Sequence, residues 1–252
     1  MVCDTLVPFL SQYSVIDLLI NVILIFSGYL IRDSILFGSV KPSFSTFSGE
    51  LESNETLSYG SLCFLTFGIG SLVVIVIWMV LFGDIRVFKA VNYYIFSISL
   101  TILISSIMGR LFSRPKPNTV HLCGSDVQYS SCNAVLPQKL LLHQFSSFPS
   151  VHSSESAAAS VFLCLLLSEL WESSSLFAAV FKASPILFTI FVMASRIWDK
   201  QSYFDDIVAG LFVGSFAAYI SFTSFKREIS LVSNQRNNGQ TDTSSFPLPR
   251  YN

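Results

Sequence analysis

The sequence is short of charged residues. Asp, Glu, Lys and Arg together make up 12% of its 252 residues, whereas soluble domains carry about 25%. Hydrophobic residues make up 52% of the chain, and neither half of it is polar. A chain of this composition is solvated mainly by lipid, so the scarcity of charge excludes an ordinary soluble domain.

Features of several functional classes are also missing. The formal net charge is -1, so the chain lacks the basic excess that binding to nucleic acid requires. It contains no Gly-rich nucleotide loop, no Cys-x-x-Cys pair and no cluster of metal-ligating residues, so we expect no cofactor and no metal. Histidine is rare, with three copies, and none follows His152. His152 adjoins a hydrophobic run, which makes it the first candidate for chemistry.

Long apolar runs, by contrast, are abundant. A bilayer core of about 30 Å needs roughly 20 apolar residues in a helix. Six runs of about this length predict an all-α membrane protein with six transmembrane helices in a bundle, near residues 13–32, 61–82, 92–112, 152–170, 176–196 and 206–225. No basic residue precedes the first run, so we expect a retained helix rather than a cleaved leader. The helices form one domain over residues 1–225, and residues 226–252 form a polar, disordered cytosolic tail.

Six helices would place both termini on one side of an endomembrane or the plasma membrane. Basic residues in the loop at 83–91 and at the start of the tail favour the cytosol for that side. The opposite loops would then face the lumen or the exterior, where Asn54 begins a glycosylation sequon. Cys123 and Cys132 share the longest of these loops, and a disulfide between them requires an oxidising compartment. Free thiols are the alternative, and the sequence leaves both open.

Polar residues gather at the helix ends that emerge on this same side. They are Arg110 and Arg114 around the end of the third helix, Ser150, Val151 and His152 at the start of the fourth, Arg196 at the end of the fifth, and Asp206 at the start of the sixth. Arginine grips phosphate oxygens with a planar fork of donors. A helix N-terminus offers free N–H groups to an anion, and a histidine can protonate a leaving group. The set predicts a phosphate site.

These residues resemble the motifs of the type-2 phosphatidic acid phosphatase superfamily, the lipid phosphate phosphatases. Pro149-Ser150-Val151-His152 is similar to its Pro-Ser-Gly-His motif. Ser195-Arg196, with Asp206 at the right spacing, is similar to Ser-Arg-x5-His-x3-Asp. Gly109-Arg110-Leu111 and Arg114-Pro115 are similar to the end of the Lys-x6-Arg-Pro motif. The resemblance covers about residues 10–225.

The resemblance implies a six-helix fold and metal-independent hydrolysis of lipid phosphate monoesters. It makes His152 the general acid and Asp206 the carboxylate that orients a nucleophilic histidine. It also implies that Arg110, Arg114, Arg196, Ser150 and Val151 bind the phosphate. The expected partners are therefore membrane lipids with a phosphorylated headgroup, and assembly into a homo-oligomer is left open.

Two positions depart from the family pattern. Ser202 stands where the family has its nucleophilic histidine, and Ile107 stands where it has a phosphate-binding lysine. Asp206 follows Ser202 by four residues, which predicts that both lie on one helix face. A serine hydroxyl without an adjacent base is a weak nucleophile, and loss of a nucleophile costs roughly 10⁴–10⁶-fold in rate. The sequence therefore predicts impaired catalysis.

Three hypotheses for function follow. In the first, the chain is a pseudoenzyme that binds phosphorylated lipids. In the second, it is an active lipid phosphatase with an altered mechanism, in which His152 activates water or serves as the base for Ser202. In the third, it is a non-enzymatic transporter or scaffold. Phosphate release and lipid binding by the purified chain distinguish the three.

Overall fold

The computed structural model describes residues 15–34, 55–81, 86–123, 129–171 and 173–243, and its regular elements are all helical. Asn54 lies outside these ranges, so its glycosylation stays a prediction. The elements are α2 (Val15–Arg32), α3 (Tyr59–Cys63), the π-helix η2 (Phe64–Ile69), α4 (Gly70–Leu81), α5 (Val87–Phe112), α6 (Thr119–Cys123), α7 (Tyr129–Asn133), α8 (Gln138–Gln144), α9 (Val151–Leu170), α10 (Leu176–Ala183), α11 (Pro185–Trp198) and α12 (Phe204–Thr243). Over the residues that the structure describes, the prediction of an all-helical fold is confirmed.

Four helical segments in the described part of the chain are long and apolar enough to cross a membrane. They are Tyr59–Leu81, Val87–Phe112, Val151–Leu170 and Phe204–Arg227. Helices α10 and α11 make a fifth if they are counted as one span with a bend of 40°. The bend lies at Pro185, which has no N–H to continue the helical hydrogen bonds of α10. The chain is an integral membrane protein with four or five candidate spans among its described residues, and the predicted count of six is not confirmed.

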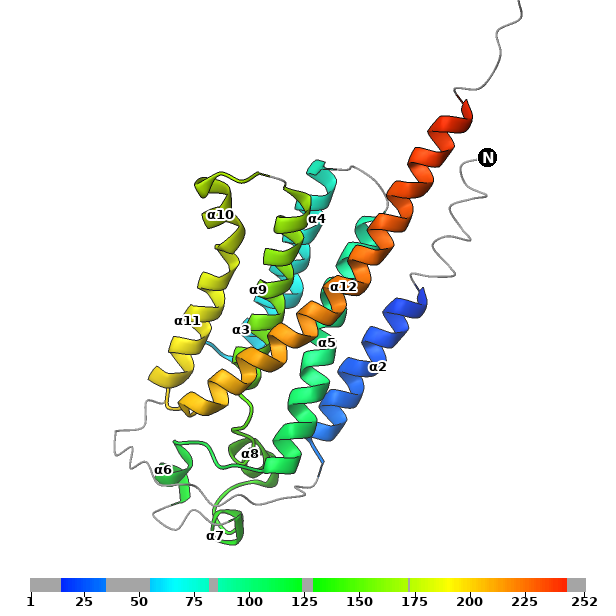
Figure 1. Cartoon of the computed structure of the whole chain (residues 1–252). Helices are drawn as coiled ribbons and strands as arrows, with labels where there is room; N and C mark the ends of the chain where they lie inside the picture. The colour runs from blue at the N-terminus through cyan, green and yellow to red at the C-terminus, as the bar shows by residue number, and fades with distance from the viewer. Residues whose placement is uncertain (1–14, 35–54, 82–85, 124–128, 172, 244–252) are drawn as a thin grey trace, which may run out of the picture.

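Helix α9 lies at the centre of the bundle, between α5, α11 and α12, while α2 packs on α5 (Figure 1). Serine and alanine fill the buried face of α9, and glycines of α12 lie against it. A Cβ atom added at Gly214 would lie 2.0 Å from the carbonyl oxygen of Ser154, and one added at Gly210 would lie 2.6 Å from that of Ser150. Small residues on both helices therefore let the two backbones touch.

Helix α12 is continuous from Phe204 to Thr243, so the predicted domain boundary at residue 225 falls inside it. The helix extends beyond the rest of the bundle in Figure 1. Residues 244–252 lie outside the described ranges, and the predicted disorder of the tail stays a prediction.

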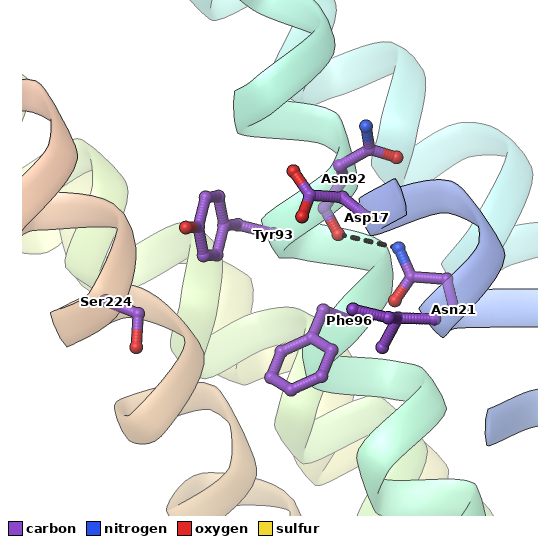
Figure 2. Close-up of a pocket in the computed structure, with 7 residues that line it drawn as sticks. Asp17, Asn21, Asn92, Tyr93, Phe96 and Ser224 are labelled. Atoms are coloured by element: carbon purple, nitrogen blue, oxygen red, sulfur yellow. Dashed lines mark hydrogen bonds between the residues drawn. The ribbon is translucent and has the colours of Figure 1, made fainter. Parts of the chain in front are cut away.

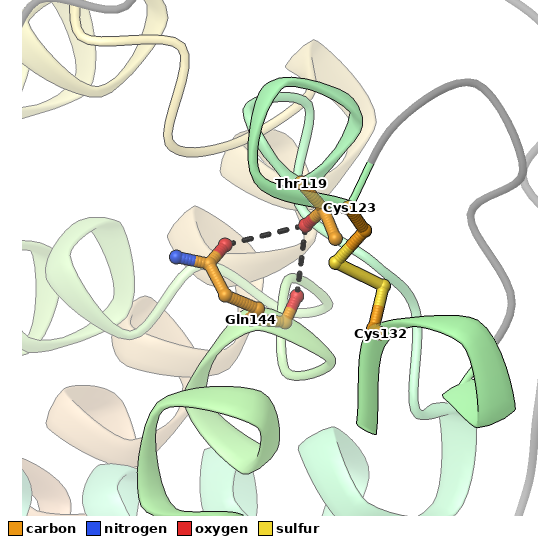
Figure 3. Close-up of a disulfide and its surroundings, with 4 residues drawn as sticks. All are labelled: Thr119, Cys123, Cys132 and Gln144. Atoms are coloured by element: carbon orange, nitrogen blue, oxygen red, sulfur yellow. Dashed lines mark hydrogen bonds between the residues drawn. A yellow bond between two sulfur atoms is a disulfide. The ribbon is translucent and has the colours of Figure 1, made fainter. Parts of the chain in front are cut away.

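The loop between α5 and α9 folds into the three short helices α6, α7 and α8. A disulfide between Cys123 and Cys132 joins α6 to α7, with 5.0 Å between the two Cα atoms. Beside it, the Thr119 hydroxyl donates a hydrogen bond to the side-chain oxygen of Gln144, at 3.2 Å (Figure 3). The backbone N–H of Lys116 donates to the carbonyl of the same Gln144, at 2.9 Å. The beginning of this loop is therefore fastened to its end.

Candidate functional site

The helix ends that carry the motif residues meet at one end of the bundle (Figure 1). They surround a pocket of about 30 Å³, which is room for about two water molecules. The described residues that line it are Arg32, Lys116, His143, Ser146, Ser147, Ser150, Val151, His152, Arg196, Gln201 and Ser202. Three of these side chains are basic and none is acidic, so the pocket suits a small anion.

The start of α9 forms one wall of the pocket. The backbone N–H of Ser150 donates to the carbonyl of Asp206, at 2.9 Å, which ties the start of α9 to the start of α12. The hydroxyls of Ser153 and Ser202 each donate to the hydroxyl oxygen of Ser150, at 3.2 Å. Val151 follows in the first turn and also lines the pocket. The positive end of the α9 dipole therefore faces the space that an anion would occupy.

Arg196 reaches the pocket from the last turn of α11, where 1% of its surface is exposed. Its Nη2 donates to the carbonyl of Leu57 at 2.7 Å and to Oδ2 of Asp199 at 2.9 Å. A second carboxylate, that of Glu55, lies 3.6 Å from its Nη1. The same Nη1 lies 3.4 Å from Nε2 of His152. These contacts hold the guanidinium so that one edge is directed at His152 and the pocket.

Asp206 and Arg114 form a buried clamp between the loop and α12. The Asp206 side chain is fully buried, and its Oδ1 accepts from Nη1 of Arg114 at 2.8 Å. Its Oδ2 accepts from the Ser147 hydroxyl and from the backbone N–H of Tyr203. Arg114 also pairs with Asp205 and lies over the ring of Tyr203, 4.1 Å from its centroid. Arg114, predicted to bind phosphate, does not line the pocket, because these two carboxylates hold it elsewhere.

Arg110 also lies away from the pocket. It is 1% exposed, and its Nη2 donates to the carbonyl of Leu142 in α8, at 3.1 Å. Within the described residues its Nε and Nη1 have no hydrogen-bond partner. Its position joins α5 to α8, and the phosphate-binding role assigned to it stays a prediction.

Tyr59 packs against His152 and is itself held by Glu155. The ring of Tyr59 meets the imidazole edge-on, with 5.7 Å between the ring centroids. The Tyr59 hydroxyl donates to Oε1 of Glu155 at 2.6 Å, and Glu155 is fully buried one turn after His152. The guanidinium of Arg32 lies 4.6 Å from the centre of the same tyrosine ring. The Tyr59 contact limits how far the imidazole can turn away from the pocket.

Comparison with known proteins identifies the family. The family model described as the PAP2 superfamily matches residues 90–230, which include α5, α9, α11 and the start of α12. The chain belongs to this superfamily. The matched segment contains every residue of the pocket except Arg32.

Two curated proteins from other organisms are similar to part of the PAP2 chain. A Drosophila melanogaster protein named as a phosphatidate phosphatase is 26% identical over 155 residues, which cover 54% of this chain and 41% of that protein. An Arabidopsis thaliana protein named as lipid phosphate phosphatase 4 is 31% identical over 124 residues, covering 44% of this chain and 40% of that protein. The matches thus span about two fifths of each relative's length. No solved structure matches the chain.

The position of the PAP2 nucleophile lies in the pocket but not on α12. Ser202 is 9% exposed and precedes the helix, which begins at Phe204. The prediction that Ser202 and Asp206 share a helix face is therefore wrong. Both oxygens of Asp206 already accept hydrogen bonds from other groups, so its carboxylate orients Arg114 and the chain around Tyr203 rather than residue 202.

The aligned position of the PAP2 lysine does not face the pocket. Ile107 is 38% exposed and is not among the pocket-lining residues. Lys116, which follows α5 at the start of the loop, supplies the pocket's ammonium group instead. Its Nζ lies 3.3 Å from both ring nitrogens of His143 and 3.1 Å from Oε1 of Gln201.

Lys116, His143 and Arg32 are the titratable pocket residues that the motifs do not reveal. The first two lie in the loop between α5 and α9, where no helical period predicts which side chains turn inward. The nearest signal is that Lys116 directly follows Arg114-Pro115 and that His143 is one of three histidines. Arg32 ends α2, outside the segment that the family model matches.

The charges of Lys116 and His143 are strongly coupled. Burial, with the nearby cations Arg32 and Arg196, lowers the pKa of Lys116 to about 7, although the charge of Glu55 opposes this. The charge of Lys116, and then burial, lowers the pKa of His143 far below its ordinary value. Near neutral pH the His143 imidazole is therefore neutral, and the lone pair on one of its ring nitrogens faces the Lys116 ammonium.

A larger cavity lies elsewhere in the bundle, between α2, α5 and α12 (Figure 2). Its volume is about 230 Å³, and Asp17, Asn21, Asn92 and Ser224 supply most of its polar lining. Asn21 donates to the backbone carbonyl of Asn92 at 3.1 Å. A carboxylate and no basic side chain among the lining residues make this cavity a poor phosphate site, so its size does not make it the functional one.

Proposed function

We propose that the pocket binds the terminal phosphate of a phosphorylated membrane lipid, of the phosphatidic acid type. One observation carries this: Lys116 and Arg196 converge with His152 on a pocket without acidic lining at the start of α9. Within the described residues, no carboxylate lies within ion-pair distance of Lys116. A bound phosphate would supply the missing countercharge. Both relatives carry names that refer to lipid phosphates.

The family's usual route of hydrolysis is impaired in this proposal. Ser202 occupies the nucleophile's position, and its hydroxyl donates to Ser150 rather than to a base. A serine without an adjacent base attacks poorly, so turnover through residue 202 should be lower by roughly 10⁴–10⁶-fold. Hydrolysis by this chain then requires another nucleophile.

The proposed orientation puts the pocket on the lumenal or extracellular side and both termini in the cytosol. The disulfide in the same loop supports it, because disulfides persist in oxidising compartments. The scheme needs α2 as a sixth span. Its 18 residues reach about 27 Å along the axis, and Leu18, Ile23 and Phe26 are each more than half exposed on its surface. Such a surface suits lipid.

Replacing Arg196 by lysine should weaken binding of lysophosphatidic acid about tenfold, or about 1.4 kcal/mol. Lysine keeps the charge but lacks the planar guanidinium. That group can bind two phosphate oxygens at once, and its hydrogen bond to Asp199 fixes its orientation. The measurement is a titration of the purified full-length chain in detergent micelles.

The matched control is Arg227→Lys, an exposed arginine far along α12. It should leave the affinity unchanged. An equal loss in both variants, or no loss in Arg196→Lys, would count against this pocket as the phosphate site.

Binding of a small dianion should weaken as the pH rises above about 7, because Lys116 then loses its proton. Sulfate is the probe, since it stays a dianion throughout. We expect about tenfold weaker binding at about pH 9 than at about pH 6. The other groups facing Lys116 are His143, Arg32, Arg196 and Glu55.

The variant Lys116→Met separates Lys116 from these groups. It should bind sulfate weakly at both pH values, with the pH dependence gone. A pH dependence that survives in this variant would assign the titration to a different side chain.

A further inference from the structure

We propose that His143 is the nucleophile of this chain and that Lys116 holds the phosphoryl group beside it. The inference rests on the proposed function, since it needs a lipid phosphate in the pocket. It accounts for both departures from the family pattern together. The histidine lost at position 202 and the lysine lost at position 107 reappear as a histidine and a lysine on the loop between α5 and α9.

The pocket places one histidine beside each of two cations. Lys116 contacts the ring nitrogens of His143 at 3.3 Å. Arg196 lies 3.4 Å from Nε2 of His152. A phosphoryl group held by the two cations would therefore meet an imidazole from α8 and another from α9. Displacement at phosphorus needs an attacking group and a leaving-group acid in line with each other, and the pair supplies one of each.

Contacts within the loop fix the positions of His143 and Lys116 relative to each other. Lys116 donates its backbone N–H to Gln144, the residue after His143. The Thr119 hydroxyl donates to the side chain of the same glutamine, and the disulfide between Cys123 and Cys132 cross-links the chain between Thr119 and Gln144 (Figure 3). On the other side of His143 in the sequence, Arg110 donates to the carbonyl of Leu142, the residue before it. A nucleophile must be held to within a few tenths of an ångström, and these contacts fix the backbone on both sides of it.

Competing nucleophiles in the pocket are less suited to attack. The Ser202 hydroxyl has Ser150 as its described partner, and neither oxygen of Asp206 accepts from it. His152 lies against Arg196 in the position of the family's general acid. The imidazole of His143 is kept neutral by Lys116, so it attacks without first losing a proton.

The reaction then proceeds in two steps. A ring nitrogen of His143 attacks the phosphorus of the lipid monoester, so that an N–P bond forms while the P–O bond to the lipid alcohol breaks. His152, whose Nε2 accepts from Arg196, is neutral at the start, so it takes the proton of the monoanionic phosphate monoester and gives it to the departing alkoxide. In the second step His152 takes a proton from water, whose oxygen attacks phosphorus. The N–P bond breaks, inorganic phosphate leaves with the proton that His152 took from water, and both histidines return to their first states.

The test uses the purified full-length chain with lysophosphatidic acid labelled with ³²P in its phosphate. The reaction is quenched in alkali, in which a phosphohistidine survives and a phosphoserine does not. We expect labelled chain whose label is lost in acid and maps to His143 by mass spectrometry. His143→Gln should abolish the label and lower phosphate release by roughly 10⁴-fold. The matched control, His121→Gln, changes an exposed histidine on α6 and should preserve both.

Sulfate binding distinguishes a variant whose pocket is misfolded from one that has lost only its nucleophile. If His143→Gln binds sulfate within about threefold of the parent chain, its pocket is folded and the loss of label is chemical. Acid-stable label at Ser202, label at His152, unchanged release in His143→Gln, or no release from the parent chain would each overturn the inference. Binding without label leaves the proposed function standing, whereas absence of sulfate and lipid binding removes both.

Discussion

Ser202→His, made in a chain that already carries His143→Gln, is expected to raise phosphate release by roughly 10³-fold. Position 202 lines the pocket, and its side chain points to the hydroxyl of Ser150 at 3.2 Å. An imidazole there would approach phosphorus beside the first turn of α9, where His152 can protonate the leaving group. The substitution restores the family's nucleophile.

The expected gain is smaller than the full value of a nucleophile, roughly 10⁴–10⁶-fold. In the family the aspartate orients the attacking ring. Here Asp206 accepts from Arg114, Ser147 and Tyr203, so an imidazole at residue 202 would have to compete with these donors for the carboxylate. A histidine ring that no carboxylate orients gives a smaller rate gain. In serine proteases, replacing the aspartate that orients the catalytic histidine lowers kcat by about 10⁴-fold.

The rate is measured as inorganic phosphate released from lysophosphatidic acid. Ser168→His in the same background is the matched control, because Ser168 is exposed near the far end of α9. It should give no gain. A failure of Ser202→His to exceed this control would show that residue 202 lies outside the reactive geometry.

Gly214→Ala is expected to destabilise the folded chain by about 3 kcal/mol. The new methyl would lie 2.0 Å from the carbonyl oxygen of Ser154 and 2.9 Å from Cβ of Ala157. Backbone cannot yield as a flexible side chain can, so α12 has to move away from α9. That movement would also stretch the bond between the Ser150 N–H and the Asp206 carbonyl, on which the pocket depends.

Thermal unfolding in detergent, followed by tryptophan fluorescence, measures this effect, and we expect the midpoint to fall by roughly 10 °C. Gly60→Ala is the matched control, because a Cβ atom at Gly60 meets nothing within 4 Å. It should be neutral or stabilising by about 0.5 kcal/mol, since alanine favours a helix more than glycine does. Equal midpoints for the two variants would contradict the close approach of α9 and α12.

The helix-end residues were largely predictable because motif spacing and helical length place them at the same end of the bundle. His152, Arg196 and Ser202 line one pocket, as the sequence arguments require. Arg114 was harder, because nothing in its spacing shows that Asp205 and Asp206 will both bind it. The side chain of a long arginine is directed by its partners, which only tertiary structure reveals.

Loop residues escaped prediction for a different reason. Hydrophobic period identifies which face of a helix is buried, but Lys116 and His143 belong to a loop whose path depends on a disulfide and on hydrogen bonds to Gln144. The predicted count of six spans is not confirmed: the described residues hold four candidate spans, or five if α10 and α11, bent at Pro185, are one, and α2 is not among them. Composition detects apolar length and not the bend within it.

The contact between Lys116 and His143 has a consequence for which lipids the protein can accept. The ammonium is shared between His143 and Gln201 in a pocket with space for about two waters. An incoming group must be compact enough to enter and anionic enough to draw the lysine away from both. A phosphate with one ester bond meets these conditions. The phosphate of phosphatidylcholine, which is esterified to both glycerol and choline, is too bulky. We therefore expect the protein not to bind the abundant phosphodiester lipids around it and to bind the rarer lipids that end in a phosphate monoester.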